Sequence, residues 1–276
     1  MELNIKGLEL STQIMIEESL KRGIGVEIID AKENLIRLTK GEKVEYIQQA
    51  TKTSADRYIV PLLMENKQVT KLLLEEQNMN VPQGAVIHSQ EEALQVYKNF
   101  EGKEIVVKPN STNFGQGVVI LDENRKVNDF KKAVDYALAL DTTILIEEFF
   151  RGKEYRFLVI GDELGAVVHR VPANVVGDGK HTIEELVEIK NQNPLRGKGY
   201  VTPLEKIQLG VVEKDFLLKQ NLIEKSILDK DMTVYLRENS NVSTGGDTID
   251  YTDEMHPRYK DIAIKAAKAL GAKICG

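Results

Sequence analysis

The sequence predicts an α+β protein that is divided into two or three subdomains. Its 276 residues are enough to bury a sizeable core, and chains of this length commonly form more than one compact unit. Hydrophobic residues make up 42% of the chain and charged residues 29%, which is typical of ordinary globular proteins. Stretches with helical spacing and short apolar runs typical of strands alternate along the chain.

Residues 1–66 predict a small α/β segment. Leu10–Arg22 has its apolar residues at roughly helical spacing, and Gly23 ends that helix. Short apolar runs predict three strands, at 26–29, 35–38 and 44–47. Helical spacing returns over Ser54–Glu76, and the Asn-Val-Pro sequence at 80–82 stops it.

Residues 67–150 predict a second segment in which strands and helices alternate. Ser89-x-x-Glu92 is a capping box, and it predicts a helix that reaches Phe100. The apolar run that begins at Glu104 predicts a strand that must end at Pro109. Further strands are predicted at 85–87, 118–121 and 143–148, and a helix at 127–140.

Residues 151–276 predict a third segment that is richer in loops. Strands are predicted at 154–160, 165–170 and 233–237, with a short one at 272–275. Helices are predicted at 183–191, 214–221 and 259–270. The stretch Asn239–Asp253 is polar and contains glycine, and it is too long to be a simple connection.

Charge and composition exclude several classes of protein. With 37 Lys+Arg and 43 Asp+Glu the formal charge is −6, so no general attraction to nucleic acid or to anionic membranes is expected. No apolar run approaches the ~20 residues of a membrane span. The single cysteine, Cys275, excludes an internal disulfide and is predicted to be a small strand residue. We therefore expect a cytoplasmic protein, and the scattered histidines predict no zinc site.

Lys108 and the loop after it form the first candidate site. A lysine at the end of a buried strand can hold a fixed positive charge toward an anion. The loop that follows contains Ser111, Gly115 and Gly117, and glycines let backbone N–H groups approach phosphates closely. It is not a P-loop, because no Gly-Lys-Ser/Thr closes it. The alternative is a hairpin whose lysine points to solvent.

A pair of acids around a turn forms the second candidate site. Glu147 and Glu154 lie at the two ends of a strand–turn–strand connection. Phe149 and Phe150, between them, offer a surface for a flat ring. A carboxylate at the far end can accept hydrogen bonds from two ribose hydroxyls. The alternative is two solvent-facing acids beside a hairpin turn.

The order of these features resembles the ATP-grasp superfamily, whose enzymes hold ATP between two α+β subdomains. The resemblance implies that Lys108 contacts α- and β-phosphate oxygens, and that Ser111–Gly117 is a flap over the triphosphate. It also implies a second phosphate lysine, Lys67, whose alternative interpretation is an exposed helix lysine. The implied adenine and ribose residues are Glu147, Glu148, Phe149, Phe150 and Glu154.

In the terms of this superfamily, residues 1–66 are an N-terminal α/β segment that precedes the clamp. Residues 67–150 are the small lid subdomain with the glycine loop, and residues 151–276 are a C-terminal subdomain that is incomplete. The enzymes of the superfamily join a carboxylate to an amine through an acyl phosphate. The resemblance therefore implies an ADP-forming ligase that makes a C–N bond.

Two later stretches, at 170–179 and 236–250, resemble the ATP-grasp modules of two groups within the superfamily. One is cyanophycin synthetase. The other is the C-terminal module of the bifunctional bacterial glutathione synthetase, in which a glutamate–cysteine ligase precedes the ATP-grasp ligase. The Ser-Thr-Asn-Phe-Gly sequence at 111–115 and Asn-Ser-Asn at 239–241 are closer to the second group. The resemblance covers essentially the whole chain.

The closer resemblance implies a reaction that joins γ-glutamylcysteine to glycine while ATP becomes ADP and phosphate. Its partners would be small peptide and amino-acid substrates and a fused upstream glutamate–cysteine ligase domain. Two alternatives remain open. One is a cyanophycin-type peptide ligase, and the other is a nucleotide-binding module of this fold without catalysis.

Several polar residues are candidates for the ligase chemistry. Arg237 is placed to neutralise charge on the transferred phosphoryl group, and we predict it to be catalytic. Arginine binds carboxylates with two parallel hydrogen bonds, which suits an anionic peptide. The predicted substrate residues are Arg156, Arg170, Asn241, Gly245 and Gly246. Each arginine has a structural ion pair as its alternative role.

ATP and Mg²⁺ are the cofactors that the resemblance implies. In this superfamily the magnesium ligands are acids on a late strand and in a Glu-x-Asn pair. The resemblance places the first of them just after Gly276, so no metal ligand is predicted within the chain. The first acids to suspect otherwise are Asp247, Asp250 and Asp253. We therefore expect these residues by themselves to bind nucleotide weakly and to lack turnover.

Overall fold

The computed structural model describes residues 3–112 and 115–276, and it divides into two compact units. Unit 1 consists of residues 3–56, Lys153–Pro257 and Ile274–Gly276. Unit 2 consists of Arg57–Gly152 and Arg258–Lys273. Both units contain helices and antiparallel sheets, so the predicted α+β class is confirmed. The division into 1–66, 67–150 and 151–276 remains a prediction.

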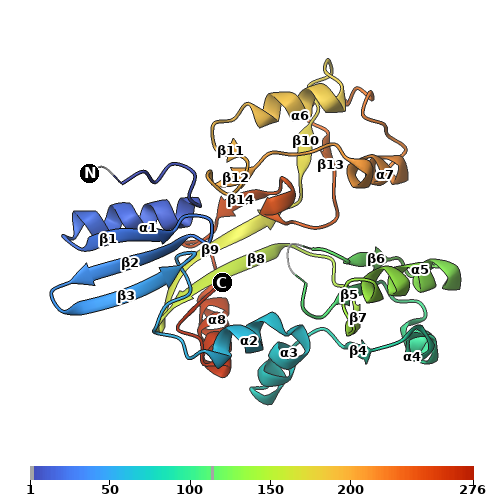
Figure 1. Ribbon diagram of the computed structural model, residues 1–276. Helices are drawn as coiled ribbons and strands as arrows, with labels where there is room; N and C mark the ends of the chain where they lie inside the picture. Colours follow the sequence, from blue (N-terminus) through green and yellow to red (C-terminus); the bar gives the residue numbers. More distant parts are fainter. Residues whose placement is uncertain (1–2, 113–114) are drawn as a thin grey trace. The chain divides into compact units, whose positions relative to one another are not determined.

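Unit 1 begins with one helix on a three-stranded sheet (Figure 1). Helix α1 (Leu10–Lys21) precedes β1 (Gly25–Asp30), β2 (Leu35–Lys40) and β3 (Lys43–Gln48). The strands form an antiparallel meander in the order β1-β2-β3. Ile16 of the helix packs with Ile36 and Ile47 of the sheet, and all three are buried.

A second sheet of unit 1 has the order β14-β9-β8-β15. Its strands are β8 (Glu154–Ile160), β9 (Glu163–Val171), β14 (Asp247–Asp250) and β15 (Ile274–Cys275). The register places Glu154 opposite Arg170 and Arg156 opposite Val168. Because alternate strand residues share a face, Glu154, Arg156 and Arg170 lie on the same side of this sheet.

The remainder of unit 1 has its own core of buried aliphatic residues. Its elements are β10 (Asn174–Val176), α6 (Ile183–Asn191), β11 (Arg196–Gly197), β12 (Leu204–Glu205), α7 (Val211–Lys219), β13 (Thr233–Tyr235) and the 3-10 turn η2 (Val242–Thr244). β10 pairs with β13, and β11 pairs with β12. Val175, Leu217 and Leu236 are buried in the core that these elements share.

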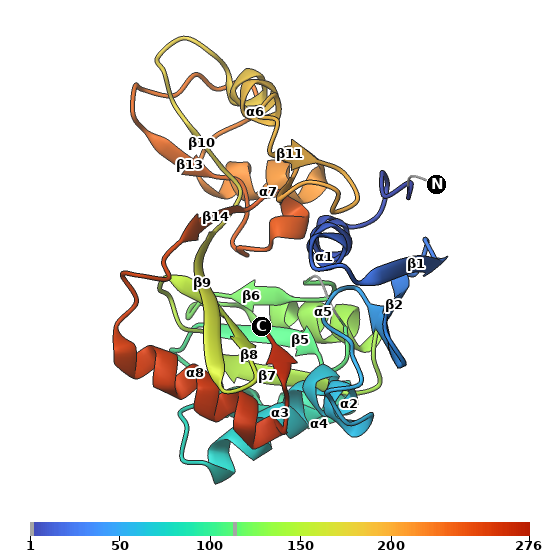
Figure 2. The same cartoon turned by 90° about the vertical axis from the view of Figure 1, so that its left-hand side faces the viewer.

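Unit 2 is built on a four-stranded antiparallel sheet with the order β4-β7-β5-β6; Figure 1 labels all four strands, and Figure 2 shows β7, β5 and β6 from another side. Its strands are β4 (Gly84–Ile87), β5 (Ile105–Pro109), β6 (Val119–Leu121) and β7 (Ile144–Glu148). Its helices are α2 (Ile59–Glu65), α3 (Lys67–Glu76), α4 (Gln90–Val96), the 3-10 turn η1 (Tyr97–Phe100), α5 (Val127–Leu138) and α8 (Pro257–Leu270). Helix α8, far along the chain, returns to α3, where Lys265 Nζ donates to Gln77 O at 2.8 Å.

The two faces of the unit 2 sheet have different chemistry. Val107 and Ile146 belong to the buried core together with Phe130 of α5. Lys108 and Glu147 alternate with these residues, so they point to the opposite face. Lys108 and Glu147 therefore lie on the face that α4 and α5 do not cover.

Several predicted elements have different limits in the structure. The predicted helix Ser54–Glu76 is two helices, because Asn66 is extended (φ −88°, ψ 102°) and caps α3 by accepting a hydrogen bond from Val69 N at 3.0 Å. The stretch Asn239–Asp253 contains the strand β14, which the sequence did not predict. In the predicted capping box Ser89 accepts from Glu92 N, but the Glu92 carboxylate accepts from His88 N.

Within the described residues, the helices are either too short or too polar to cross a membrane.

Candidate functional site

The central feature of unit 2 is a buried carboxylate with two lysines. Glu147, on β7, exposes 1% of its side chain. Lys71 of α3 donates a hydrogen bond from Nζ to Glu147 Oε1 at 2.6 Å, and Lys108 of β5 forms an ion pair with Oε2. A buried carboxylate needs compensating positive charge. Two ammonium groups for one carboxylate leave this cluster with a net positive charge, which suits an anionic ligand.

Lys67 lies one helical turn before Lys71, and it holds the segment that follows β5. Its Nζ donates to the carbonyl oxygens of Pro109 (3.1 Å), Asn110 (2.9 Å) and Thr112 (2.7 Å). An ammonium group has three donors, so all of them are used. Burial, and then the positive charge of Lys108, lower the pKa of Lys67. The alternative interpretations, an exposed helix lysine for Lys67 and a hairpin lysine pointing to solvent for Lys108, are therefore wrong.

Asn110 fixes the base of the glycine loop against the first turn of α3. Its side-chain oxygen accepts from Gln68 N at 3.0 Å, and its own N–H donates to Thr143 O at 2.9 Å. Ser111 N then donates to Asp141 Oδ2 at 2.7 Å. The loop therefore begins from a fixed position beside the lysines.

The predicted flap Ser111–Gly117 is described only in part, since Asn113 and Phe114 lie outside the described residues. Gly115 and Gly117 both have positive φ, at 76° and 73°. A Cβ atom on Gly117 would lie 2.5 Å from Pro109 Cγ, so only glycine fits there. Both glycines are therefore explained by the backbone conformation of the loop.

The predicted adenine hinge follows Glu147 directly. Glu148 forms an ion pair with Lys103, and its N–H donates to Gln83 O at 2.9 Å. Phe149 N donates to Glu104 O at 2.9 Å, and Phe150 is 66% exposed. The alternative interpretation of two solvent-facing acids is wrong for Glu147, because only 1% of its side chain is exposed and two lysines pair with it.

In unit 1, three of the predicted residues gather on the sheet formed by β8 and β9. Glu154 accepts from Ser240 Oγ at 2.5 Å and pairs with Arg170 Nη1 at 3.0 Å. Arg170 therefore has the structural ion pair that the sequence left open as its alternative. Burial, together with the nearby charge of Arg170, lowers the pKa of the Arg156 guanidinium. Cys275, a β15 residue as predicted, has its thiol pKa raised by burial.

Arg237, the predicted catalytic residue, is held by a buried acid that the sequence analysis missed. Glu213, in the first turn of α7, accepts from Gly210 N at 2.9 Å through Oε2. Its other oxygen forms an ion pair with the Nε of Arg237. Glu213 is buried, so this pair fixes the guanidinium relative to the start of α7. The Gly-x-x-Glu spacing of a helix start was the available signal.

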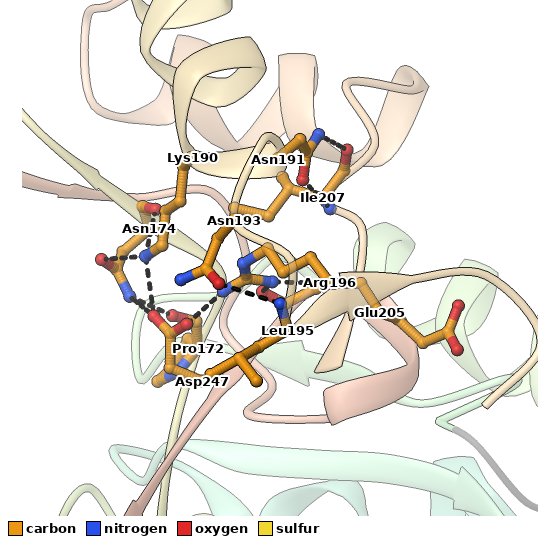
Figure 3. A network of polar contacts seen from close by, with 11 residues as sticks. Pro172, Asn174, Lys190, Asn191, Asn193, Leu195, Arg196, Glu205, Ile207 and Asp247 are labelled. Carbon is orange, nitrogen blue, oxygen red and sulfur yellow. Dashed lines mark hydrogen bonds and ion pairs between the residues drawn. The ribbon is translucent and has the colours of Figure 1, made fainter. Parts of the chain in front are cut away.

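Asp247 is the centre of a polar network that holds the end of the loop after Arg237 (Figure 3). Arg196, whose side chain is 1% exposed, forms an ion pair with Asp247 and donates to the carbonyl oxygens of Glu205 (2.7 Å) and Gly245 (3.0 Å). Lys190 Nζ lies 2.7 Å from the other carboxylate oxygen of Asp247. These contacts tie the loop to β12 and α6.

The loop itself closes through its own backbone. Gly245 N donates to Val242 O at 3.0 Å, and Gly246 N donates to Asn241 O at 3.1 Å. The backbone amides of these two predicted substrate residues are thus bonded within the loop. A Cβ on Gly245 would lie 2.7 Å from Ile207 Cα, which explains the glycine there by close packing.

The acids of the described residues do not fit a magnesium site. No group of three or more His, Cys, Asp or Glu side chains in that part of the chain could hold a metal ion. Asp247 is committed to Arg196 and Lys190, and the Asp250 carboxylate accepts from Thr252. Magnesium needs several oxygen ligands around one point, which these residues do not supply.

Comparison with known proteins identifies the fold. Residues 6–59 match the family described as ATP-grasp-like domain, and residues 65–185 match the phosphoribosylglycinamide synthetase ATP-grasp (A) domain. The crystal structure of a bifunctional glutathione synthetase from Pasteurella multocida aligns with 99% of this chain at a TM-score of 0.69 and 47% identity, and the match covers 36% of that chain. The predicted ATP-grasp fold is therefore confirmed.

Curated relatives carry the same name in several bacteria. The glutathione biosynthesis bifunctional protein GshAB of Clostridium perfringens is 56% identical over 100% of this chain. The protein of that name from Listeria monocytogenes serotype 4b is 51% identical over 99% of this chain. The chain spans 36% of the length of each of these relatives.

Proposed function

We propose that this chain, which has the ATP-grasp fold, is the ATP-dependent carboxylate–amine ligase part of a protein of glutathione synthesis. The proposed reaction joins γ-glutamylcysteine to glycine and converts ATP to ADP and phosphate. The observation that carries the proposal is the positively charged cluster of Lys71, Lys108 and Glu147 beside the glycine loop. An excess of ammonium groups at a partly buried position suits a polyphosphate.

The nucleotide would be bound mainly through unit 2. Lys108 and Lys67 are the proposed phosphate lysines, and Ser111, Gly115 and Gly117 belong to the loop over the phosphates. Lys67 would have to give up one of its carbonyl acceptors to reach a phosphate. Adenine would lie at Glu148, Phe149 and Phe150, and Glu154 would accept the ribose hydroxyls.

The chemistry would proceed in two transfers. A carboxylate oxygen of the cysteinyl residue attacks the γ-phosphorus, the bond to the bridging oxygen of ADP breaks, and ADP leaves. The amine of glycine then attacks the acyl carbon, phosphate leaves, and the amine loses a proton. Arg237, held by Glu213, would neutralise charge on the phosphoryl group. Neither transfer requires a side-chain nucleophile, so positioning and charge neutralisation carry the catalysis.

Arg156 and Arg170 are the proposed contacts for the carboxylates of the peptide, with Asn241 and its loop nearby in the chain. The relatives are called bifunctional and are much longer than this chain, which supports a fused glutamate–cysteine ligase domain upstream. The remaining partners would be the small peptide and amino-acid substrates.

A product assay on the intact native protein tests the proposal. With ATP, Mg²⁺, γ-glutamylcysteine and glycine, we expect one ADP for each glutathione, measured by coupled ADP detection and mass spectrometry. Arg237→Ala should abolish both products while the protein remains folded. ADP release with poly-aspartate and arginine, but not with the first pair, would favour the cyanophycin-type alternative. ATP binding without ADP release under either condition would favour a non-catalytic module.

A further inference from the structure

Glu147 has two lysine partners although its single negative charge needs only one. Lys71 approaches Oε1 and Lys108 approaches Oε2, so each lysine has its own oxygen. Lys71 is 21% exposed and Lys108 is 23% exposed, whereas Glu147 is almost completely enclosed. The sequence singled out Lys108 for the phosphates and gave Lys71 no role.

The two lysines differ in where they lie. Lys71 is on α3, and it donates a hydrogen bond to Oε1 at 2.6 Å. Lys108 forms its ion pair with Oε2 from β5, directly before Pro109 and the segment that leads to the glycine loop. Lys108 is therefore the one of the two ammonium groups that lies next to the proposed phosphate loop.

We propose that Lys71 is a positioning residue that keeps Glu147 neutralised while Lys108 leaves it to bind the nucleotide phosphates. This inference rests on the proposed function, specifically on the assignment of Lys108 to the phosphates. Lys71 would not touch the nucleotide. Its role is to make the transfer of Lys108 from carboxylate to phosphate possible.

The physical reason is the cost of an unpaired buried charge. If Lys108 were the sole partner of Glu147, binding of Lys108 to a phosphate would leave a buried carboxylate without a counter-charge. That loss would oppose the new contact. With Lys71 in place, Glu147 keeps one charged hydrogen bond throughout. Lys67 is not a substitute, because its three donors hold Pro109, Asn110 and Thr112.

The test is a mutant cycle between Lys71 and Glu147, read by calorimetric binding of ATP, tripolyphosphate and adenosine to the folded chain. Lys71→Gln should weaken the binding of ATP and of tripolyphosphate by about tenfold, because it removes one charged contact. The affinity for adenosine should stay unchanged. In a Glu147→Gln background the same Lys71 substitution should change ATP affinity by less than about threefold, because a neutral amide needs no counter-charge.

Lys132→Gln is the matched control, because it removes the same charge from an exposed position on α5 in the same unit. It should leave all three affinities unchanged. Lys71→Arg keeps a cation beside Glu147, so its ATP affinity should stay within about threefold of wild type. This variant also keeps the test decisive if Lys71→Gln does not fold, because a tenfold loss in Lys71→Arg would overturn the proposal.

Other outcomes would overturn it. A loss that persists in the Glu147→Gln background would mean that Lys71 contacts phosphate directly. A lower melting temperature with unchanged ATP affinity in Lys71→Gln would mean that the residue is only structural. If wild type binds neither ATP nor tripolyphosphate, the proposed function fails and this inference fails with it. If wild type binds ATP and Lys71→Gln binds it with the same affinity, the inference is rejected and the proposed function is not.

Discussion

The Asp247 carboxylate is the counter-charge of a fully buried guanidinium, and Asp247→Asn removes that charge with almost no change of shape. Arg196 keeps its two carbonyl acceptors in the variant but loses its acidic partner. Removing one member of a buried ion pair costs about 3–5 kcal/mol. Because the Asp247 side chain is 24% exposed and Lys190 can turn to water, we expect about 3 kcal/mol, the lower end of that range.

Urea unfolding followed by circular dichroism measures this change. A loss of about 3 kcal/mol is about a hundredfold in the unfolding constant, and it should move the midpoint of the unit 1 transition by about 1 M or more. Asp250→Asn is the matched control, since Asp250 lies three residues further along β14 and is exposed. Its free energy of unfolding should stay within about 0.5 kcal/mol of wild type.

Two results would contradict a role of Asp247 as the counter-charge of Arg196. One is a free energy of unfolding for Asp247→Asn that equals that of the Asp250→Asn control. The other comes from the double variant in which Arg196→Met is added to Asp247→Asn. If the orphaned guanidinium causes the loss, removing it should recover part of the stability. A further additive loss would show that Arg196 acts through its carbonyl contacts alone.

Three further predictions concern single positions. The Asp178 carboxylate raises the pKa of His181 above its ordinary 6.5. The stabilisation from this pair is therefore complete below the unfolded-state pKa and is lost as pH rises through the folded-state pKa. An NMR titration in which Asp178→Asn leaves the His181 pKa unchanged would contradict this prediction. Glu154→Gln should weaken the binding of ATP more than the binding of tripolyphosphate, which has no ribose hydroxyls. Equal losses of affinity for both ligands in calorimetry would limit Glu154 to a structural role. Gly84→Ala should lower the free energy of unfolding by about 1–3 kcal/mol in a urea titration, because its Cβ would lie 2.7 Å from Glu147 Cγ. An unchanged urea midpoint would contradict this prediction and show that the sheet adjusts to the added methyl group.

The local features of the fold could be predicted from the sequence where the signal is itself local. The proline at 109 ends β5 as expected, and the helix ended by Gly23 has nearly the predicted limits. The break at Asn66 was missed although asparagine is a preferred residue at helix starts. Strand β14 was missed because it is four residues long and carries Asp at both ends, and Asp has low β-propensity.

The partners of the candidate residues could not be predicted in the same way. Lys71 and Glu147 are 76 residues apart, and Arg196 and Asp247 are 51 residues apart, so tertiary packing decides both pairs. One signal was present for Lys71. It follows Lys67 by four positions, and that spacing places both lysines on one face of α3.

Lys108, in the proposed function, is a phosphate-binding lysine of an ATP site. Calorimetric titration of the folded chain with ATP, for wild type and Lys108→Ala, measures this role. One charge-assisted contact contributes about 1.5–3 kcal/mol, so the variant should bind ATP about tenfold more weakly or worse, with Lys132→Ala unchanged as the control. An ATP affinity in folded Lys108→Ala equal to that of wild type would contradict the claim.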